Sequence, residues 1–490
     1  MPADRCMPAD WMGYATDRRT EQGAEASKVG LTTRELFTGL PMITAMSFFI
    51  QMLSTTVLNT ALPAIAAALH RSPFSVHMAV VSYALTVALL IPVSGWAADR
   101  FGTRRTFLFA VLMFVLGSAC CAGSRDLPQL VASRVLQGVG GAMMTPVSRL
   151  ALLRAYRRDE FVQVFTFITI PGLVGPVLGP VVGGWIVAHA PWQWIFLINI
   201  PLGIAGLAAA LKLFPDFRQE RGPFDLKGFL LISGALLCIT CGLEFSGGQS
   251  SFLAAAALYA CGLALMPAYV WHARRCREPL IRLRVFAVRT FAIGISGNMV
   301  ARLGIGAIPF LVPMLLQVGL GYSPDKAGLV LMASAAGALL TKAVVLHVLH
   351  RLGYRRTLLF LTLAIAATLG IMGMIDASWS AWSIAGFLFA QGVLKSAQFT
   401  SMNTITLGDL KEDTASDGNS LLSVAQNLSI SFGVAVSTVL LRLFSGMGSE
   451  LSALHCTCVA VGAMTALAAF VFMLLRAEDG AHLLSSSKKS

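Results

Sequence analysis

Apolar runs of about twenty residues recur along the chain from Pro41 to Leu475, separated by short polar loops. A helix of this length crosses a hydrocarbon core roughly 30 Å thick, and it satisfies its own backbone hydrogen bonds in lipid. We therefore predict an all-α integral membrane protein with fourteen transmembrane helices. The predicted spans are 40–62, 76–97, 105–123, 128–150, 162–187, 193–213, 227–246, 252–271, 291–317, 326–347, 357–375, 380–403, 417–443 and 455–475.

The composition of the chain supports this prediction. Of its 490 residues, 56% are hydrophobic and only 12% are charged, and the mean hydropathy is +0.72. A soluble domain has roughly 25% charged residues. The composition therefore excludes a soluble globular protein.

The basic residues predict the orientation in the membrane, because short cytoplasmic loops retain Lys and Arg. Of the 37 basic residues, about 28 fall in the two termini and the even-numbered loops, and about 3 fall in the odd-numbered loops. Both termini are therefore expected in the cytoplasm. This retention and the attraction of anionic lipids explain the net charge of +13, including the basic linker from His272 to Arg289, so we predict no nucleic-acid partner.

The segment before the first span, residues 1–39, is polar and has no apolar core of a signal peptide. The tetrapeptide MPAD occurs at Met1 and again at Met7, which favours a disordered leader or an over-extended start. We expect the first helix to act as the insertion signal.

The nine cysteines are scattered, mostly inside predicted helices, and form no disulfide framework. The pair Cys456 and Cys458 and the pair His347 and His350 have metal-ligand character, but neither has a matching second pair elsewhere. We predict neither a metal site nor a cofactor.

The chain contains an internal repeat. HRLGYRRT, beginning at His350, aligns with DRFGTRRT, beginning at Asp99, so Gly353 matches Gly102 at an offset of 251 (353 − 102). Ser323-Pro324 matches Ser72-Pro73 at the same offset. Two homologous halves are typical of transporters, whose substrate site lies near mid-membrane where the halves meet.

Four motifs carry a family resemblance that covers nearly the whole chain. They are GWAADRFGTRR from Gly95, LVASRVLQGVGGA from Leu130, GLVGPVLGPVVGG from Gly172 and WQWIFLINIP from Trp192. In this order they resemble the major facilitator superfamily, and within it the fourteen-helix drug:proton antiporter group.

The resemblance implies the domain organisation and the function. It implies a six-helix bundle at 40–213, two inserted helices and a linker at 214–290, a second bundle at 291–476 and a cytoplasmic tail at 477–490. It also implies a monomeric inner-membrane exporter that exchanges protons for small amphipathic compounds and has no enzymatic activity.

The first motif is interpreted as a gate, because its glycines permit helix ends to approach closely and Asp99 can pair with an arginine or with a helix N-terminus. The alternative is that the arginines only determine topology. The predicted gating residues of both repeats are Gly95, Asp99, Arg100, Gly102, Arg104, Arg105, Gly353, Arg355 and Arg356.

The third motif is the antiporter signature, in which glycines four residues apart let a neighbouring helix pack closely, and prolines interrupt the helix. Ordinary transmembrane packing explains the glycines equally well. The residues of this motif are Gly172, Gly175, Pro176, Gly179, Gly183 and Gly184.

Ionisable residues inside the spans are candidates for the substrate cavity, because a charge in lipid costs several kcal/mol unless it faces water or a partner. For Arg302 and Arg134 we favour a cavity role, whereas for Lys342, Lys395 and the terminal Arg149 and Arg442 snorkelling to the interface explains the charge equally well. The full set of predicted cavity or coupling residues is Gln51, Ser54, Thr55, Asn59, Arg134, Gln137, Arg302 and Lys395, with Thr56 beside them.

The chain departs from its group in the first helix, where the usual L-D-x-T reads Leu53-Ser54-Thr55-Thr56. The carboxylate that suits proton coupling and cationic drugs is therefore missing. A cavity with arginine and little acid favours neutral or anionic cargo.

Three functions are compatible with these features. The first is proton-coupled export of amphipathic drug-like compounds, and the second is export of organic anions such as citrate or a metal–citrate complex. The third, a membrane enzyme or a non-transporting sensor, lacks motif support, because H-E-x-x-H, G-x-S-x-G and a P-loop do not occur.

Overall fold

The computed structural model describes residues 39–156, 158–219, 223–246, 252–276, 279–280, 283–410, 412–446 and 449–480. The predicted leader, apart from Gly39, and the last ten residues of the predicted tail lie outside the described residues.

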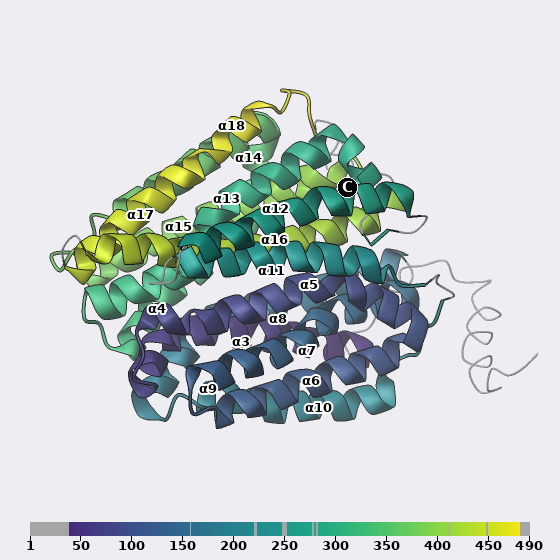
Figure 1. The fold of residues 1–490 in the computed structure, drawn as a ribbon, viewed down its shortest axis with the longest axis horizontal. Coiled ribbons are helices and arrows are strands. Elements are labelled where there is room, and N and C mark those ends of the chain that lie inside the picture. The colour runs from purple at the N-terminus through teal and green to yellow at the C-terminus, as the bar shows by residue number, and fades with distance from the viewer. Residues whose placement is uncertain are drawn as a thin grey trace, which may run out of the picture.

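Helices account for nearly all of the described chain (Figure 1). They are α3 (Leu40–Ala68), α4 (Pro73–Val76), α5 (Met78–Phe101), α6 (Thr103–Gly123), α7 (Leu127–Ala155), α8 (Arg158–His189), α9 (Trp194–Leu197), α10 (Asn199–Leu213), α11 (Leu226–Ser246), α12 (Phe252–Arg275), η1 (Leu283–Ala287), α13 (Arg289–Met314), η2 (Leu315–Gly319), α14 (Pro324–Met372), α15 (Ala381–Gly408), α16 (Glu412–Ser445), α17 (Glu450–Ala466) and α18 (Ala468–Met473). The all-α membrane fold is confirmed.

Every predicted span overlaps one or two of these helices. The spans 193–213, 291–317 and 455–475 each cover two successive helices, namely α9 with α10, α13 with η2, and α17 with α18, whereas 326–347 and 357–375 both lie mainly on α14. In the described ranges, nine helices are long and apolar enough to cross a membrane. The total of fourteen stays a prediction.

The observed helices extend beyond the predicted apolar runs. Helix α3 continues to Ala68 and α15 to Gly408, several residues past the expected ends. The helical backbone continues outside the hydrocarbon core, where polar residues and side-chain caps are tolerated. The Asp126 side chain supplies one such cap to α7 by accepting a 2.8 Å hydrogen bond from the backbone amide of Gln129.

The internal repeat is visible in the backbone. Gly102 ends α5 with φ +97°, and its repeat partner Gly353 interrupts α14 with φ +71°. Ser72 and Ser323 both adopt extended backbone immediately before a helix that begins with proline. Positive φ is easy only for glycine, so each half turns sharply at the same place in its sequence.

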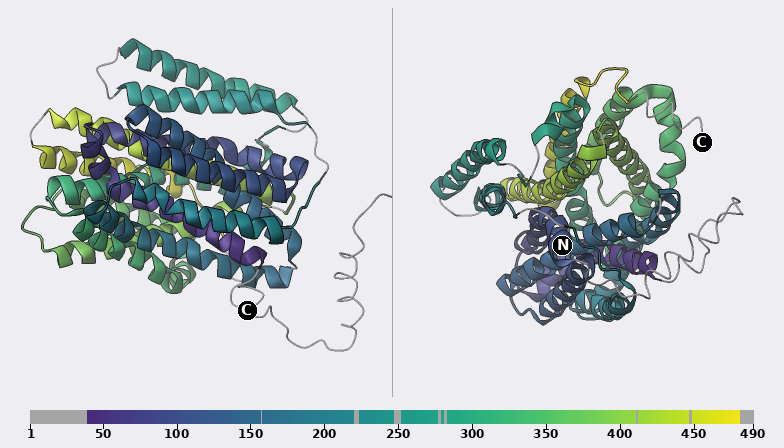
Figure 2. Two further views of the ribbon diagram at one scale, coloured as in Figure 1. Left: turned by 90° about the horizontal axis from the view of Figure 1, so that it is seen from below. Right: turned by 90° about the vertical axis from the view of Figure 1, so that its right-hand side faces the viewer.

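The helices form two packed groups with a pair of helices alongside (Figure 2). We call α3 to α10 the N-terminal half and α13 to α18 the C-terminal half. Helices α11 and α12 pack against each other, and α11 also contacts α16. We call the end of the bundle that carries the basic loops and residues 39 and 480 the inner end, following the predicted orientation, and the opposite end the outer end.

One hydrophobic cluster joins the two halves toward the outer end. Leu62 and Ile65 of α3 belong to the same buried cluster as Phe310 and Leu315 of the C-terminal half and Ala327 of α14. Buried apolar contact between the halves therefore closes the outer end and leaves a cavity beneath it.

Candidate transport cavity and gate

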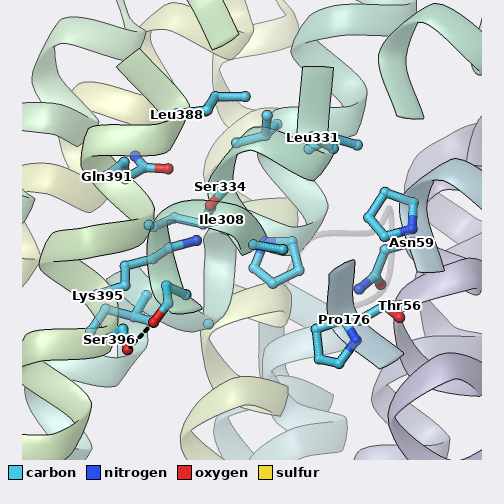
Figure 3. A pocket seen from close by; sticks show the side chains of 18 of the residues that line it. Thr56, Asn59, Pro176, Ile308, Leu331, Ser334, Leu388, Gln391, Lys395 and Ser396 are labelled. Carbon is cyan, nitrogen blue, oxygen red and sulfur yellow. Dashed lines mark hydrogen bonds between the residues drawn. The ribbon is translucent and has the colours of Figure 1, made fainter. Parts of the chain in front are cut away.

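A cavity of about 450 Å³ lies between the halves (Figure 3). Helices α3 and α8 line one side, and α13, α14, α15 and α16 line the other. Most of the lining is apolar, including Pro176 and Pro180 of α8. Its polar and charged residues are Thr56, Asn59, Thr60, Arg302, Ser334, Gln391, Lys395 and Ser396.

Arg302 lines this cavity from the middle of α13. Only 6% of its surface is exposed, and its guanidinium carbon lies 4.7 Å from the centre of the Phe399 ring. Its Nε has no hydrogen-bond partner among the described residues. A cation–π contact compensates part of the cost of burying the charge, and an anion in the cavity would compensate more.

Lys395 brings a second cation to the same cavity. Its ammonium group points into the space enclosed by the helices (Figure 3). Gln391, one turn earlier on α15, also lines the cavity, and its Nε2 donates to Thr368 at 3.4 Å while its Oε1 has no partner in the described part of the chain. Of the two explanations left open for Lys395, the placement agrees with the cavity role.

No Asp or Glu is found among the described residues that line the cavity. Two cations and uncharged donors in a mostly apolar enclosure create a positive potential, which low-dielectric walls strengthen. The arrangement therefore suits a ligand that has an apolar body and a negative group.

The predicted residues of the first helix divide between two places. Asn59 and Thr56 line the cavity. Gln51 instead donates to the Gly141 carbonyl at 2.9 Å and accepts from Thr145, both on α7. Thr55 donates to the carbonyls of its own helix.

Ser54, Arg134 and Gln137 lie in a separate polar network inside the N-terminal half. Gln137 donates to Ser54 at 3.3 Å and to Ser118 at 2.7 Å, and Asn199 donates to Ser54 at 3.4 Å. The position where the group usually has an aspartate therefore faces amide and hydroxyl groups and does not line this cavity.

Arg134 is held within the same network. Its Nε donates to the Ala79 carbonyl at 2.9 Å, and its Nη1 donates to the side-chain oxygen of Gln137. Its guanidinium carbon lies 4.2 Å from the centre of the Tyr83 ring. It is 1% exposed and does not line the cavity. Our preference for a cavity role does not agree with this placement, because carbonyl, amide and aromatic partners satisfy the cation inside one half.

The remaining intramembrane cations also differ in placement. The Arg149 guanidinium lies 4.5 Å from the centre of the Phe48 ring. Arg442 lies near the outer end of α16 and has partners. The side chain of Lys342 lies outside the described residues.

The predicted gate loop is bound to its own half of the protein. Asp99, 2% exposed, pairs with Arg154 of α7 at 2.5 Å, and Arg154 also donates to Gln219 at 3.0 Å. The backbone amide of Gln219 in turn donates to the backbone carbonyl of Asp99 at 3.2 Å. The pairing of Asp99 with an arginine is thus present, but this ion pair does not cross between the halves.

The two glycines of the loop have different surroundings. Gly102 has positive φ, and a Cβ there would collide with the Asp216 side chain. A Cβ at Gly95 would meet nothing within 4 Å. The expectation of close approach therefore holds at Gly102 and is wrong at Gly95 in this conformation.

The arginines of the two loops are mostly at the surface. Arg104 donates to the Leu211 carbonyl, whereas Arg100, Arg105 and Arg356 are exposed and Arg355 is half-buried. An exposed guanidinium with no specific partner among the described residues fits the topological explanation.

The inner end of the C-terminal half is held by the start of the tail. Arg289 pairs with Asp479 at 3.2 Å and donates to the Leu474 carbonyl. A Cβ at Gly480 would lie 2.5 Å from the Tyr354 ring, so the tail also packs against the residue that follows Gly353. Among the described residues that line the central cavity, none is a predicted gating residue.

The glycines of the antiporter signature pack against α3. A Cβ at Gly175 would lie 2.9 Å from the Met52 Cβ, and one at Gly183 would lie 2.7 Å from the Val57 carbonyl oxygen. A Cβ at Gly179 would collide with the Thr56 hydroxyl, and one at Gly172 would lie 3.1 Å from the Phe48 ring. These small residues let two helices that line the cavity approach closely.

Gly184 acts at a different interface. A Cβ at Gly184 would collide with the Pro324 carbonyl of α14, and one at Gly328 would collide with the Pro180 carbonyl of α8. The reciprocal glycines therefore permit backbone contact between the halves at the outer end.

A hydrogen bond between the halves adds to this outer closure. Gln317, in the π-helical turn after α13, donates to the Thr60 carbonyl of α3 at 2.8 Å. Neither Gln317 nor Gln391 was predicted, because the candidates apart from Gln137 were intramembrane charges and polar residues of the first helix. The sequence feature that points to both residues is a glutamine side chain within an apolar run.

Sequence comparison identifies the class of protein that this fold and cavity define. The profile of the Major Facilitator Superfamily matches residues 44–270 and 294–489. The chain belongs to this superfamily of membrane transporters, as the four motifs predicted. It is a multi-pass membrane protein and a small-molecule transporter.

Several similar proteins share one name, "Putative multidrug resistance protein MdtD". The protein from Cronobacter sakazakii is 48% identical over 406 residues, which cover 82% of this chain and 86% of that protein. The protein from Klebsiella pneumoniae strain 342 is 45% identical over 440 residues, covering 88% and 93%, and that from Escherichia coli strain 55989 is 42% identical over 455 residues, covering 91% and 96%.

Solved structures of transporters share the fold. The POT family transporter PepTSo superimposes with a TM-score of 0.67 at 14% identity, over 91% of this chain and 98% of that one. A D-xylose-proton symporter gives a TM-score of 0.63 at 14% identity, over 90% and 98%. At this identity the likeness concerns the fold alone.

Proposed function

We propose that the protein is a secondary exporter of small amphipathic compounds, of the multidrug type, whose cavity prefers substrates with a negative charge. The observation that carries the charge preference is the placement of Arg302 and Lys395 in a mostly apolar cavity whose described lining contains no acid. The export of amphipathic compounds is supported by the similarity to the multidrug resistance proteins and by the antiporter signature.

The proposed transport cycle starts from the conformation described above. Contacts of Gly184 with Pro324 and of Gln317 with Thr60 close the outer end, so this conformation takes up substrate from the inner side. With the basic loops in the cytoplasm, that side is the cytoplasm of a bacterial cell with the protein in the inner membrane. Substrate then leaves after the halves rock and the outer contacts separate.

The proposed energy source is proton antiport by a monomer. It is supported by the family resemblance and by the lack of a phosphate-binding loop in the sequence. The proposed gate role of Asp99 belongs to the same cycle, because the charge lies at the inner helix end, where the halves must approach when the inner side closes.

A second candidate function is export of compact organic anions such as citrate or another di- or tricarboxylate. The placement of two cations in the lining of one cavity favours it, since a guanidinium binds carboxylate with two parallel hydrogen bonds. The apolar remainder of the lining favours the first candidate.

The experiment uses everted membrane vesicles with and without a pH gradient. We expect wild-type protein to accumulate an amphipathic anionic dye in preference to a lipophilic cation of similar size. Arg302→Ala should lower anion uptake at least tenfold, because it removes the buried cation, and Arg302→Lys should recover part of it. Arg125→Ala removes an exposed arginine that belongs to neither the predicted gate nor the cavity, and it serves as the matched control.

The outcomes separate the candidates. Uptake of tricarboxylates but of no dye would support the compact-anion exporter. Uptake of lipophilic cations and of no anion would contradict the charge preference, and uptake that does not respond to a pH gradient would contradict proton antiport.

A further inference from the structure

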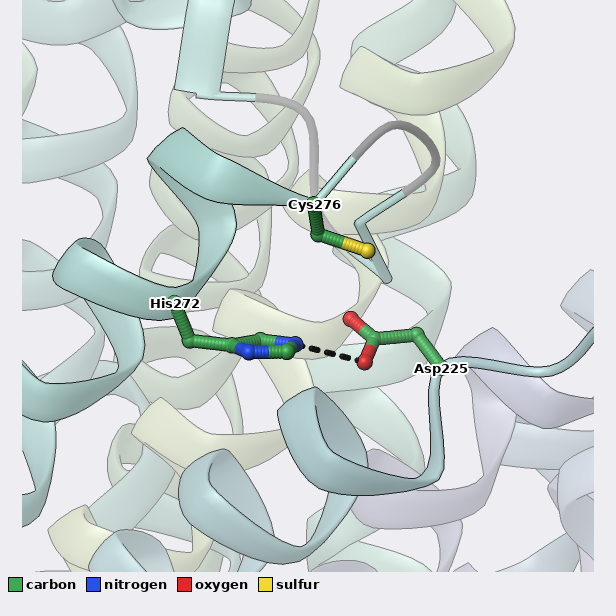
Figure 4. Close-up of side chains that lie close together, drawn as sticks. All are labelled: Asp225, His272 and Cys276. Atoms are coloured by element: carbon green, nitrogen blue, oxygen red, sulfur yellow. Dashed lines mark hydrogen bonds and ion pairs between the residues drawn. The ribbon is translucent and has the colours of Figure 1, made fainter.

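A second group of chemically active side chains lies at the inner ends of the inserted helices, and none of its residues lines the cavity. Asp225 directly precedes α11, and His272 and Cys276 stand one turn apart where α12 ends. One donor atom from each of the three residues lies within 4.8 Å of the others. Figure 4 shows the three side chains converging on one point.

The carboxylate of this group is fixed by its surroundings. The Gly228 amide donates to Asp225 Oδ1 at 2.9 Å, and the Leu280 amide donates to Oδ2 at 3.0 Å. His272 Nε2 lies 2.7 Å from Oδ1, and the Asp225 side chain is 5% exposed. Metal-binding carboxylates are typically oriented by such additional hydrogen bonds.

The two other donors are fixed by the helix. The Cys276 amide donates to the His272 carbonyl at 3.0 Å, which continues the helical turn and keeps both side chains on one face. The thiol is free and only partly exposed. Imidazole nitrogen, thiolate sulfur and carboxylate oxygen are the three donor types that zinc binds in proteins.

We propose that Asp225, His272 and Cys276 form a binding site for a divalent cation of the zinc class. Neutral imidazole, one thiolate and one carboxylate balance the charge of the ion, and the thiol proton is released to solvent on binding. The fourth position of a tetrahedral site is left to water.

The site joins the two ends of the inserted helix pair. Asp225 belongs to the segment that leaves the N-terminal half, and Cys276 belongs to the segment that leads to η1 and the C-terminal half. A bound ion would therefore cross-link the chain entering and leaving the pair. Without an ion, Asp225 and His272 share the 2.7 Å hydrogen bond described above.

The test uses purified full-length protein, stripped with a chelator and titrated with Co²⁺, whose visible and near-ultraviolet bands report four-coordinate geometry and thiolate ligation. We expect one Co²⁺ per chain with a thiolate charge-transfer band that one equivalent of Zn²⁺ abolishes. Cys276→Ser should remove this band, and His272→Ala should weaken Co²⁺ binding at least tenfold. A wild-type protein with no such band would overturn the proposal.

Cys261→Ser is the matched control, because Cys261 Sγ lies 3.8 Å from Cys238 Sγ within the same helix pair. The control should retain the band and its zinc competition. If the control lost the band and Cys276→Ser kept it, the metal would belong to the Cys238 and Cys261 pair and the proposal would fail.

A second measurement needs no substitution that could disturb folding. In wild-type protein, Zn²⁺ should slow alkylation of Cys276 by a maleimide at least tenfold, as measured by mass spectrometry of the labelled peptide, while labelling of the exposed Cys456 stays unchanged. Equal labelling of Cys276 with and without Zn²⁺ would also overturn the site.

Discussion

The residue type alone does not predict that one deeply placed arginine of this transporter lines the cavity and the other does not. Arg302 and Arg134 both occur inside apolar spans, and both are almost fully buried. The surroundings differ, because Arg134 has a carbonyl, an amide and an aromatic ring as partners within one half, whereas Arg302 contacts one ring and faces the cavity. The presence of a buried charge can be predicted from the sequence, but its partners depend on how neighbouring helices are rotated.

Asp99 permits a prediction about the gate. Asp99→Asn should lower transport at least tenfold while membrane insertion is unchanged, because it removes a charge that is buried and paired at an inner helix end. Transport is measured in everted vesicles, and insertion by the amount of protein in the membrane fraction.

Arg154→Gln is the partner variant for this test, since it removes the other member of the ion pair. If the pair serves only to hold the half together, both variants should have the same effect. A larger loss with Asp99→Asn would support a further role for the carboxylate when the inner end closes, and full activity of Asp99→Asn would remove Asp99 from the gate.

The two glycines of the predicted gate, Gly95 and Gly102, should respond differently to substitution. Gly102→Ala should destabilise the protein by about 1–2 kcal/mol or more. The alanine must keep the positive φ of this position, and its Cβ collides with the Asp216 side chain. Gly95→Ala should have little effect, because no atom lies within 4 Å of the added Cβ. Thermal unfolding in detergent measures both, and equal midpoints for the two variants would contradict the explanation.

The helices and the repeat could be predicted because both depend on local sequence. Apolar length defines each span, and glycine defines the turn at Gly102 and Gly353. The contacts of each helix face could not be predicted in the same way, because nearly every face of a transmembrane helix is apolar. The predicted cavity residue Ser54 therefore lies in a network with Gln137, while the unconsidered Gln391 lines the cavity.

The pairing of α8 with α3 yields a prediction about helix packing. Gly179→Leu should abolish transport or make the membrane permeable, because the side chain would occupy the position of the Thr56 hydroxyl beside the cavity. Gly386→Leu is the control, since Gly386 is exposed on α15, does not line the cavity and has no described atom within 4 Å of an added Cβ. Substrate uptake and dye leakage from vesicles distinguish the variants, and a fully active, tight Gly179→Leu would refute the packing argument.

The two halves of the protein are closed against each other at the outer end and are braced separately at the inner end. Gln317 reaches Thr60 across the outer interface, whereas Asp99 with Arg154 and Arg289 with Asp479 pair within single halves. The sequence predicted two halves and a central site, since the repeat and the motifs are encoded locally. It did not predict which end is closed, because both conformations use the same residues and differ only in the relative positions of the halves.

The closed outer end must open during transport, and a cross-link between the halves tests this requirement. The rings of His77, before α5, and Phe310, in α13, lie 6.0 Å apart between their centres, so this pair reports the distance between the halves. In a background without the nine native cysteines, His77→Cys with Phe310→Cys should be joined by a short, reducible bifunctional thiol reagent. Joining should stop transport, because substrate release requires the outer contacts to separate, and reduction should restore it. Each single-cysteine variant treated with the reagent serves as control. Efficient joining with undiminished transport would show that this interface stays closed throughout the cycle, and the proposed alternation of the halves would have to be abandoned.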